Sequence, residues 1–154
     1  FGFSDVLTCF LALDTEVELY PSGRISLSEF VCQPKNKEIL THIIIKKEPC
    51  EMVYLSQRNS ATDFPVLACA VAWRNGRMMT SVGARPMRAK VVVDETQLIQ
   101  DYANEKECEQ FAEMAAETLC FQSNMRASAE YRNYITKVLI KRACRIMAQR
   151  RNEQ

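Results

Sequence analysis

Residues 65–85 read PVLACAVAWRNGRMMTSVGAR, two apolar runs joined by Arg74-Asn75-Gly76-Arg77. Asn-Gly between β-prone runs indicates a hairpin, because a type I′ turn needs positive φ at both central residues. Both alternating faces of the first run are apolar or small, so we expect both faces of this strand to be covered. The hairpin is therefore predicted to form the centre of a small sheet. The position of this hairpin would then fix the positions of the polar loop that precedes it and of the helices that follow it.

The residues before the hairpin predict a strand-rich half. Apolar spacing from Ser4 to Leu13 is typical of a helix, with Ser4 or Asp5 as N-cap. Alternating and β-branched runs predict further strands. The expected segments are strands at 15–20, 24–27, 42–46 and 52–56, and a loop at 28–36.

The residues after the hairpin are predicted to be mainly helical. An extended segment is expected at 87–93. Asp94, with Gln97 in the capping-box position, predicts a short helix to about Tyr102. Asn104 opens a second helix, and a third runs from Ser128 to about Arg151. The apolar stripe expected on the third helix comprises Tyr131, Tyr134, Ile135, Val138, Leu139 and Ile146. Strands followed by helices indicate an α+β fold with segregated elements.

Composition narrows the class of protein. The 154 residues are 47% hydrophobic and 25% charged, with a net charge of +1, so bulk electrostatics do not indicate a nucleic-acid partner. Seven cysteines without CxxC spacing predict a reducing compartment and no disulfide framework. His42 is the single histidine and has no ligand cluster beside it, so no metal site is predicted.

The sequence shows no signal peptide and no apolar run near the length of a membrane span, which predicts a soluble cytoplasmic protein. The first residue is Phe1 rather than Met, which suggests a fragment or a processed chain.

No catalytic constellation is visible, and the chain has neither a Walker motif nor GxGxxG. The most unusual local feature is the polar loop Arg58–Asp63, RNSATD, between two predicted strands. Such loops commonly carry binding groups when a rigid sheet positions them. The alternative is a solvated connection in which Asp63 bonds the backbone of its neighbours. Residues 83–88, GARPMR, could likewise bind an anion or simply end a strand.

Several segments resemble one protein family. Residues 121–132, FQSNMRASAEYR, resemble the SDxRASAEYRR signature that opens the last helix of FAD-binding medium subunits in the molybdenum hydroxylase family. These are the flavoproteins of xanthine dehydrogenase and carbon monoxide dehydrogenase. Further matches follow family order: residues 3–19 resemble xSDLxPALLALDAEVxL, 58–65 resemble RRxAxDFPxV, 81–89 resemble GGVAPTPxRA, and 139–143 resemble LLRRA.

The resemblance implies a domain organisation and a role. Residues 1–48 would be the end of an FAD-binding α/β domain. Residues 49–154 would be a C-terminal domain with a three-stranded antiparallel sheet and a three-helix bundle. FAD would lie between the two domains, passing electrons from a 2Fe-2S small subunit to NAD or another acceptor. A molybdopterin-binding large subunit would oxidise the substrate.

The resemblance also implies cofactor-binding residues. Asp5 would contact the cofactor, Leu40 would line the adenine site, and the loop from Arg58 to Asp63 would approach the flavin. No catalytic residue is implied. Many members have Lys where this chain has Leu55, and the glycine-rich segments that hold the FAD diphosphate are missing. The chain alone is therefore expected to bind FAD weakly or not at all.

Three other functions remain open at this point. Leu55 favours a module that binds only the partner subunits and has a degenerate FAD site. The FAD subunit of a selenate reductase is a second branch of the same family. A nucleic-acid binder using the basic tail at 141–151 is a third hypothesis, which salt-dependent binding to duplex DNA would reveal.

Overall fold

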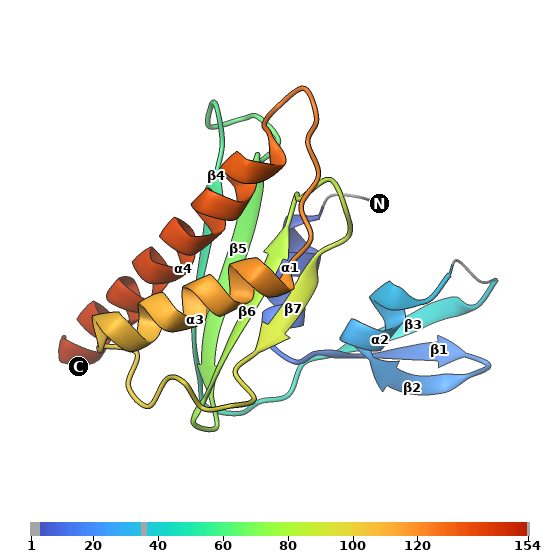
Figure 1. Cartoon of the computed structure of the whole chain (residues 1–154). Helices are drawn as coiled ribbons and strands as arrows, with labels where there is room; N and C mark the ends of the chain where they lie inside the picture. The colour runs from blue at the N-terminus through green and yellow to red at the C-terminus, as the bar shows by residue number, and fades with distance from the viewer. Residues whose placement is uncertain (1–3, 35–36, 154) are drawn as a thin grey trace.

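The computed structural model of the chain describes residues 4–34 and 37–153. Two antiparallel sheets and four helices make up this part of the chain, so the predicted α+β class is confirmed (Figure 1). The larger sheet has the strand order β4-β5-β6-β7, and the smaller has the order β2-β1-β3. The elements are α1 (Asp5–Ala12), β1 (Glu16–Tyr20), β2 (Gly23–Ser26), α2 (Leu27–Cys32), β3 (Ile39–Ile44), β4 (Cys50–Gln57), β5 (Leu67–Arg74), β6 (Arg77–Gly83), β7 (Lys90–Val93), α3 (Glu105–Thr118) and α4 (Ala129–Asn152).

The predicted hairpin is the centre of the larger sheet. Asn75 and Gly76 take φ values of 50° and 72°, as a type I′ turn requires. Arg74 therefore faces Arg77 across the turn, and β5 pairs with β6 on one side and β4 on the other. Every residue of β5 except Trp73 is buried, which confirms that both of its faces are covered.

α3 and α4 cover one face of the larger sheet (Figure 1). The β5 side chains on this face are Leu67, Cys69 and Val71, and they pack with Phe111 of α3 and Ile140 of α4. Phe111 and Ile140 are fully buried, and each such side chain contributes about 1.5–3 kcal/mol through removal of apolar area from water. This layer is the main core of the molecule.

α1 covers the other face and approaches the sheet closely. The contact consists of small side chains, with Ala12 of α1 against Ala70 and Ala72 of β5. A Cβ atom built on Gly83 would lie 2.3 Å from Thr8 Oγ1, so only glycine fits beneath this turn of α1. The alternation of small residues in β5 thus determines how near α1 can lie.

The smaller sheet and α2 extend from this core as a second, smaller cluster. Leu11 of α1, Val17 and Leu19 of β1, Leu27 of α2 and Ala89 beside β7 are its buried members. α1 is therefore shared by the two clusters, because Ala12 packs with Ala70 and Ala72 of β5 and Leu11 belongs to the smaller cluster. β3 lies at one edge of the smaller sheet, and five of its six residues are exposed.

Several local predictions are wrong. The loop predicted at 28–36 is wrong over residues 28–32, which belong to the helix α2 (Leu27–Cys32), because Ser26 Oγ accepts the Glu29 amide at 3.1 Å. Residues 35–36 of that predicted loop lie outside the described ranges. Residues 94–102 form turns rather than a helix, because the Asp94 carboxylate accepts the amides of Leu98 and Ile99 at 3.0 and 2.9 Å.

The helices and strands also differ in arrangement from the family-based expectation. The larger sheet has four strands, since β4 pairs with β5 along its whole length. Of the three C-terminal helices expected, the described residues form two, α3 and α4, which pair on one face of the sheet, because residues 94–102 form turns. The stripe expected on α4 is rotated: Tyr131 and Tyr134 are 43% and 63% exposed, whereas Arg132 and Thr136 are buried.

Candidate functional site

Three segments that are distant in the sequence meet at one end of the larger sheet. The first is the start of α1, where Ser4 is the N-cap and its Oγ accepts the Leu7 amide at 3.0 Å. This places Asp5 in the first turn, where a carboxylate also interacts favourably with the helix dipole. Asp5 accepts hydrogen bonds from the Tyr54 hydroxyl and from Arg58 Nη2, the latter at 2.9 Å. The beginning of α1 is thereby joined to the end of β4.

Arg58 organises the polar loop that follows β4. Its Nε donates to Ser56 Oγ at 3.0 Å, and its Nη1 donates to the Asp63 carbonyl at 2.7 Å. One guanidinium therefore bonds the strand, the far end of the loop and the Asp5 carboxylate. Burial, followed by the hydrogen bond to Asp5, raises the pKa of Tyr54 well above that of a free phenol. The Tyr54 hydroxyl is thus protonated at neutral pH and donates its hydrogen bond to the Asp5 carboxylate.

Asp63 carries this network to the third segment, the connection before α4. Its Oδ1 accepts Arg126 Nη1 at 2.6 Å and the Phe64 amide at 2.7 Å. The Arg126 guanidinium also lies 5.6 Å from the centre of the Phe64 ring. The hydrogen bond from Arg126, with a smaller effect of the Phe64 amide, lowers the pKa of Asp63. Asp63 therefore bonds its neighbour's backbone, as the solvated-loop alternative expects, and also joins a distant segment.

The buried side chain of Arg132 stabilises the connection before α4 through hydrogen bonds. Its side chain is 1% exposed and donates to four oxygens: the carbonyls of Val66, Gln122 and Ala127, and Asn124 Oδ1. No carboxylate is among these partners, and burial lowers the pKa of Arg132. Arg85 acts similarly at the next turn, where its Nη1 donates to the Cys120 carbonyl at 2.5 Å. Two buried guanidinium groups thus shape the connection through backbone carbonyls.

Three of the four predicted cofactor-binding residues are therefore connected, and the fourth is not. Asp5, Arg58 and Asp63 belong to one hydrogen-bonded network. Leu40 lies in β3 of the smaller sheet, opposite Leu19, and is 43% exposed. Leu55, which stands where the family has Lys, packs partly buried against the main core beneath the helices. It follows Tyr54 on the strand and so points to the opposite face of the sheet.

Sequence reasoning assigned no individual role to Tyr54, Arg126 or Arg132. Arg126 and Arg132 lie within residues 121–132, the segment with the most specific resemblance. That resemblance was the sequence signal that could have indicated a role for these two arginines. Their partners could not be identified from the sequence, since Arg126 bonds a residue 63 positions away.

The chemistry of the network is suited to binding rather than to acid–base catalysis. Four guanidinium groups, those of Arg58, Arg85, Arg126 and Arg132, accompany the two carboxylates of Asp5 and Asp63. The excess positive charge favours an anionic ligand near this end of the sheet. Within residues 4–34 and 37–153, no group of three or more His, Cys, Asp or Glu side chains is placed to hold a metal ion.

A family model matches the chain over residues 53–147, which is more than half of its length. The model describes the C-terminal domain of the CO dehydrogenase flavoprotein. The chain belongs to this family. The resemblance found in the sequence is thereby confirmed, and the matched residues of this flavoprotein domain include Arg58, Asp63, Arg126 and Arg132.

Solved structures share the fold of the flavoprotein domain and extend the likeness to the smaller sheet. Quinoline 2-oxidoreductase from Pseudomonas putida 86 superposes with a TM-score of 0.73 at 18% identity, covering 96% of this chain and 57% of that one. Reconstituted CO dehydrogenase from Oligotropha carboxidovorans gives a TM-score of 0.66 at 20% identity, covering 89% and 54%. CO dehydrogenase from Hydrogenophaga pseudoflava, lacking the Mo-pyranopterin moiety, gives 0.67 at 14% identity, covering 95% and 60%.

The chain therefore spans little more than half the length of the solved chains that it matches. No curated protein matches its sequence. Among the helices in the described ranges, none has both the length and the apolar character needed to cross a membrane.

Proposed function

We propose that this chain is part of the FAD-binding subunit of a molybdenum hydroxylase. In that complex it helps to relay electrons from 2Fe-2S clusters through FAD to NAD or another acceptor. The family match supports the assignment, since the model that covers residues 53–147 is named for a flavoprotein. A 2Fe-2S small subunit and a molybdopterin-binding large subunit are the partners that this proposal implies.

The observation that carries the proposal is the network of Asp5, Arg58, Asp63 and Arg126. It joins two of the segments in which the resemblance places cofactor-facing residues, the start of α1 and the loop at 58–63, and links them to the connection before α4. The donor set fits a flavin, because guanidinium groups suit the negative charge of its reduced ring. FAD, when bound, supplies the electron-transfer chemistry. The residues of this chain hold the loop at 58–63 in one shape and provide positive charge beside it.

The experiment that tests this proposal introduces Asp63→Asn into the full-length FAD-bearing protein. This change removes the negative charge beside Arg126 while conserving size, so the contact between the loop and the connection before α4 should weaken. We expect a lower flavin-to-protein ratio or a shifted visible spectrum, with the circular dichroism of the folded protein retained.

Asp101→Asn is the matched control. Asp101 also pairs with an arginine, Arg151 at 3.0 Å, and accepts a backbone amide, that of Ala103 at 3.0 Å, but it lies at the other end of α4. Flavin content and spectrum that respond equally to the two changes, or to neither, would contradict the proposed role of the network.

One observation favours the scaffold alternative. The polar groups of Asp5, Arg58 and Asp63 are bonded to one another, and Leu55 points into the core. A network of this kind also serves a module that binds only the partner subunits. In that case Asp63→Asn would leave flavin content unchanged but reduce co-purification of the partner subunits.

A further inference from the structure

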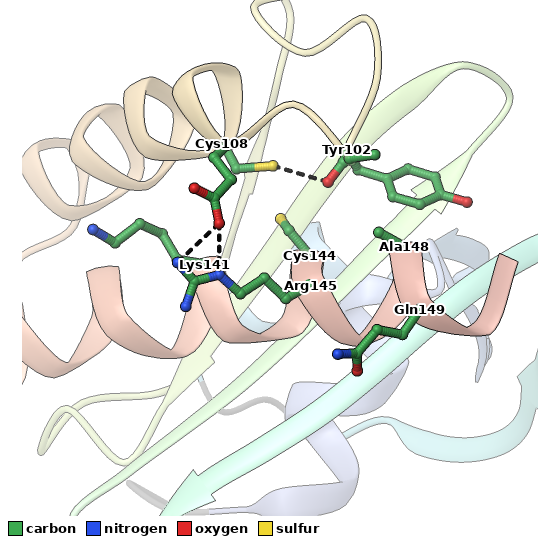
Figure 2. A pocket seen from close by; sticks show the side chains of 9 residues that line it. Tyr102, Cys108, Lys141, Cys144, Arg145, Ala148 and Gln149 are labelled. Carbon is green, nitrogen blue, oxygen red and sulfur yellow. Dashed lines mark hydrogen bonds and ion pairs between the residues drawn. The ribbon is translucent and has the colours of Figure 1, made fainter. Parts of the chain in front are cut away.

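A pocket of about 180 Å³ lies between α3 and α4, at the opposite end of these helices from the arginine network (Figure 2). Its lining includes Tyr102, Cys108, Lys141, Cys144 and Arg145. Cys108 comes from the first turns of α3 and Cys144 from the middle of α4. Figure 2 shows the two side chains on facing sides of the gap between the helices.

Cys108 and Cys144 are a pair rather than two isolated thiols. Cys108 Sγ donates to the Tyr102 carbonyl at 3.2 Å, and both cysteines line the same pocket from facing helices (Figure 2). The two residues are 3% and 1% exposed, so the pocket is their route to small molecules.

A third cysteine lies nearby but differs in surroundings. Cys69 faces the helices from β5, where its thiol lies 3.6 Å from Thr80 Oγ1. It does not line the pocket, and burial raises its pKa to about 12. Cys69 therefore provides an internal comparison for any chemistry of the pair.

We propose that Cys108 and Cys144 form a redox-active dithiol that hydrogen peroxide entering this pocket converts to a disulfide. The Cys108 sulfur attacks one peroxide oxygen and the O–O bond breaks. Cys108 becomes a sulfenic acid, and the second oxygen leaves as water with the thiol proton. The Cys144 sulfur then attacks the sulfenic sulfur, the S–O bond breaks, and a second water carries away the remaining proton. Two thiols are oxidised, and one peroxide is reduced to two waters.

The surroundings determine which sulfur reacts first. The neighbouring Cys144 thiol lowers the pKa of Cys108, whereas the Cys108 thiol and burial raise the pKa of Cys144. Cys108 also lies near the N-terminus of α3, where the helix dipole favours an anion. Lys141 and Arg145 line the pocket on the α4 side, where they pair with Glu109 and Glu105 of α3 at 2.8 and 3.0 Å. Cys108 is thus the attacking thiol and Cys144 the resolving one.

The bridge would link two helices across a long loop of chain. The segment between the two cysteines includes the connection that carries Arg126 and the start of α4 with Arg132. A disulfide that closes a loop of this length stabilises the folded chain mainly by constraining the unfolded one. We expect the midpoint of thermal unfolding to rise by about 5–15 °C on oxidation.

The experiment treats the folded full chain with hydrogen peroxide, followed by non-reducing peptide mapping. The expected product lacks two hydrogen atoms, links the peptides of Cys108 and Cys144, and reverts with dithiothreitol together with the thermal shift. Cys144→Ala should stop the reaction at a sulfenic acid on Cys108 that dimedone traps. Cys69→Ala, the matched control, should keep the bridge.

Three results would overturn the proposal. The first is a folded chain without this bridge, or with one only when urea is present. The second is a bridge that uses Cys69. The third is oxidation by glutathione disulfide at the rate found for hydrogen peroxide, because that bulky oxidant does not fit a pocket of this size and would act on an opened structure instead.

Discussion

Replacing Arg132 with alanine tests the account of the connection before α4. The guanidinium makes four hydrogen bonds at 2.7–3.0 Å, three of them to backbone carbonyls, while its side chain is 1% exposed. Arg132→Ala leaves all four oxygens without this donor and also opens a cavity.

The magnitude follows from two opposing contributions. Hydrogen bonds from a charged donor contribute about 1.5–3 kcal/mol each, and a buried group left unpaired costs about 1–3 kcal/mol. Desolvation of the guanidinium, which has no carboxylate partner, offsets part of this gain. We expect the free energy of unfolding to fall by about 3–5 kcal/mol.

Urea denaturation followed by circular dichroism measures the change. With a slope of about 2 kcal/mol/M, the midpoint should fall by about 2 M while the slope stays the same. Arg142→Ala is the control, because Arg142 is exposed on the same helix and should change stability by no more than about 0.5 kcal/mol. A loss below about 1 kcal/mol for Arg132→Ala would refute the reasoning, since the four acceptors would then be satisfied without the guanidinium.

Two further changes test the packing of α1 and the charge pair at the loop. Gly83→Ala should lower the free energy of unfolding by about 1–3 kcal/mol, because its Cβ would lie 2.3 Å from Thr8 Oγ1. Adding Thr8→Ala should cost less than the sum of the single changes in a denaturation cycle, and strict additivity would argue against the contact. Arg126 lowers the pKa of Asp63, so this carboxylate stabilises the fold above its unfolded pKa, and the effect disappears as pH falls through the lower folded value. Arg126→Met should raise the Asp63 pKa in a carboxyl-carbon NMR titration, and an unchanged value would contradict the pairing.

The central hairpin could be predicted because its cause is local. Asn75 and Gly76 tolerate the positive φ of the turn, and the flanking residues have β propensity. The strand β3 was predicted at 42–46 and begins three residues earlier, at Ile39. Its position depends on pairing with β1, including a shift in register between Glu18 and Leu19 that the sequence does not reveal.

Two similar capping patterns show where local reasoning fails. Ser26 with Glu29 begins the helix α2, although a loop is predicted at 28–36. Asp94 with Gln97 has the same spacing and predicts a helix. However, Gln97 takes a φ of 53°, and the Asp94 carboxylate accepts amides four and five residues on. Side-chain oxygens and backbone carbonyls compete to accept hydrogen bonds from these amides, and this competition decides whether a helix or a turn forms. The spacing of the capping residues in the sequence does not show which acceptor wins.

The segments that form the candidate site could be predicted from the sequence, but the hydrogen bonds that join these segments could not. Motifs indicated Asp5, Arg58 and Asp63, and the structure joins all three. Arg58 and Asp5 are 53 positions apart, so their hydrogen bond depends on how α1 crosses the sheet. The stripe on α4 was wrong for a related reason. A buried Arg132 is favoured only where several carbonyls converge on it, which tertiary structure alone determines.

The covered central strand has a consequence for the exchange of backbone amide hydrogens with solvent. β5 has a hydrogen-bonded strand on each side and a packed layer on each face, so no partial opening frees its amides. Those hydrogens can exchange only when the whole domain unfolds, and their protection reports the global free energy. β3, at the edge of the smaller sheet, can detach by itself and exchange long before β5 does. The chain thus has a gradient of local stability that declines from the hairpin at 67–83 to the strand at 39–44.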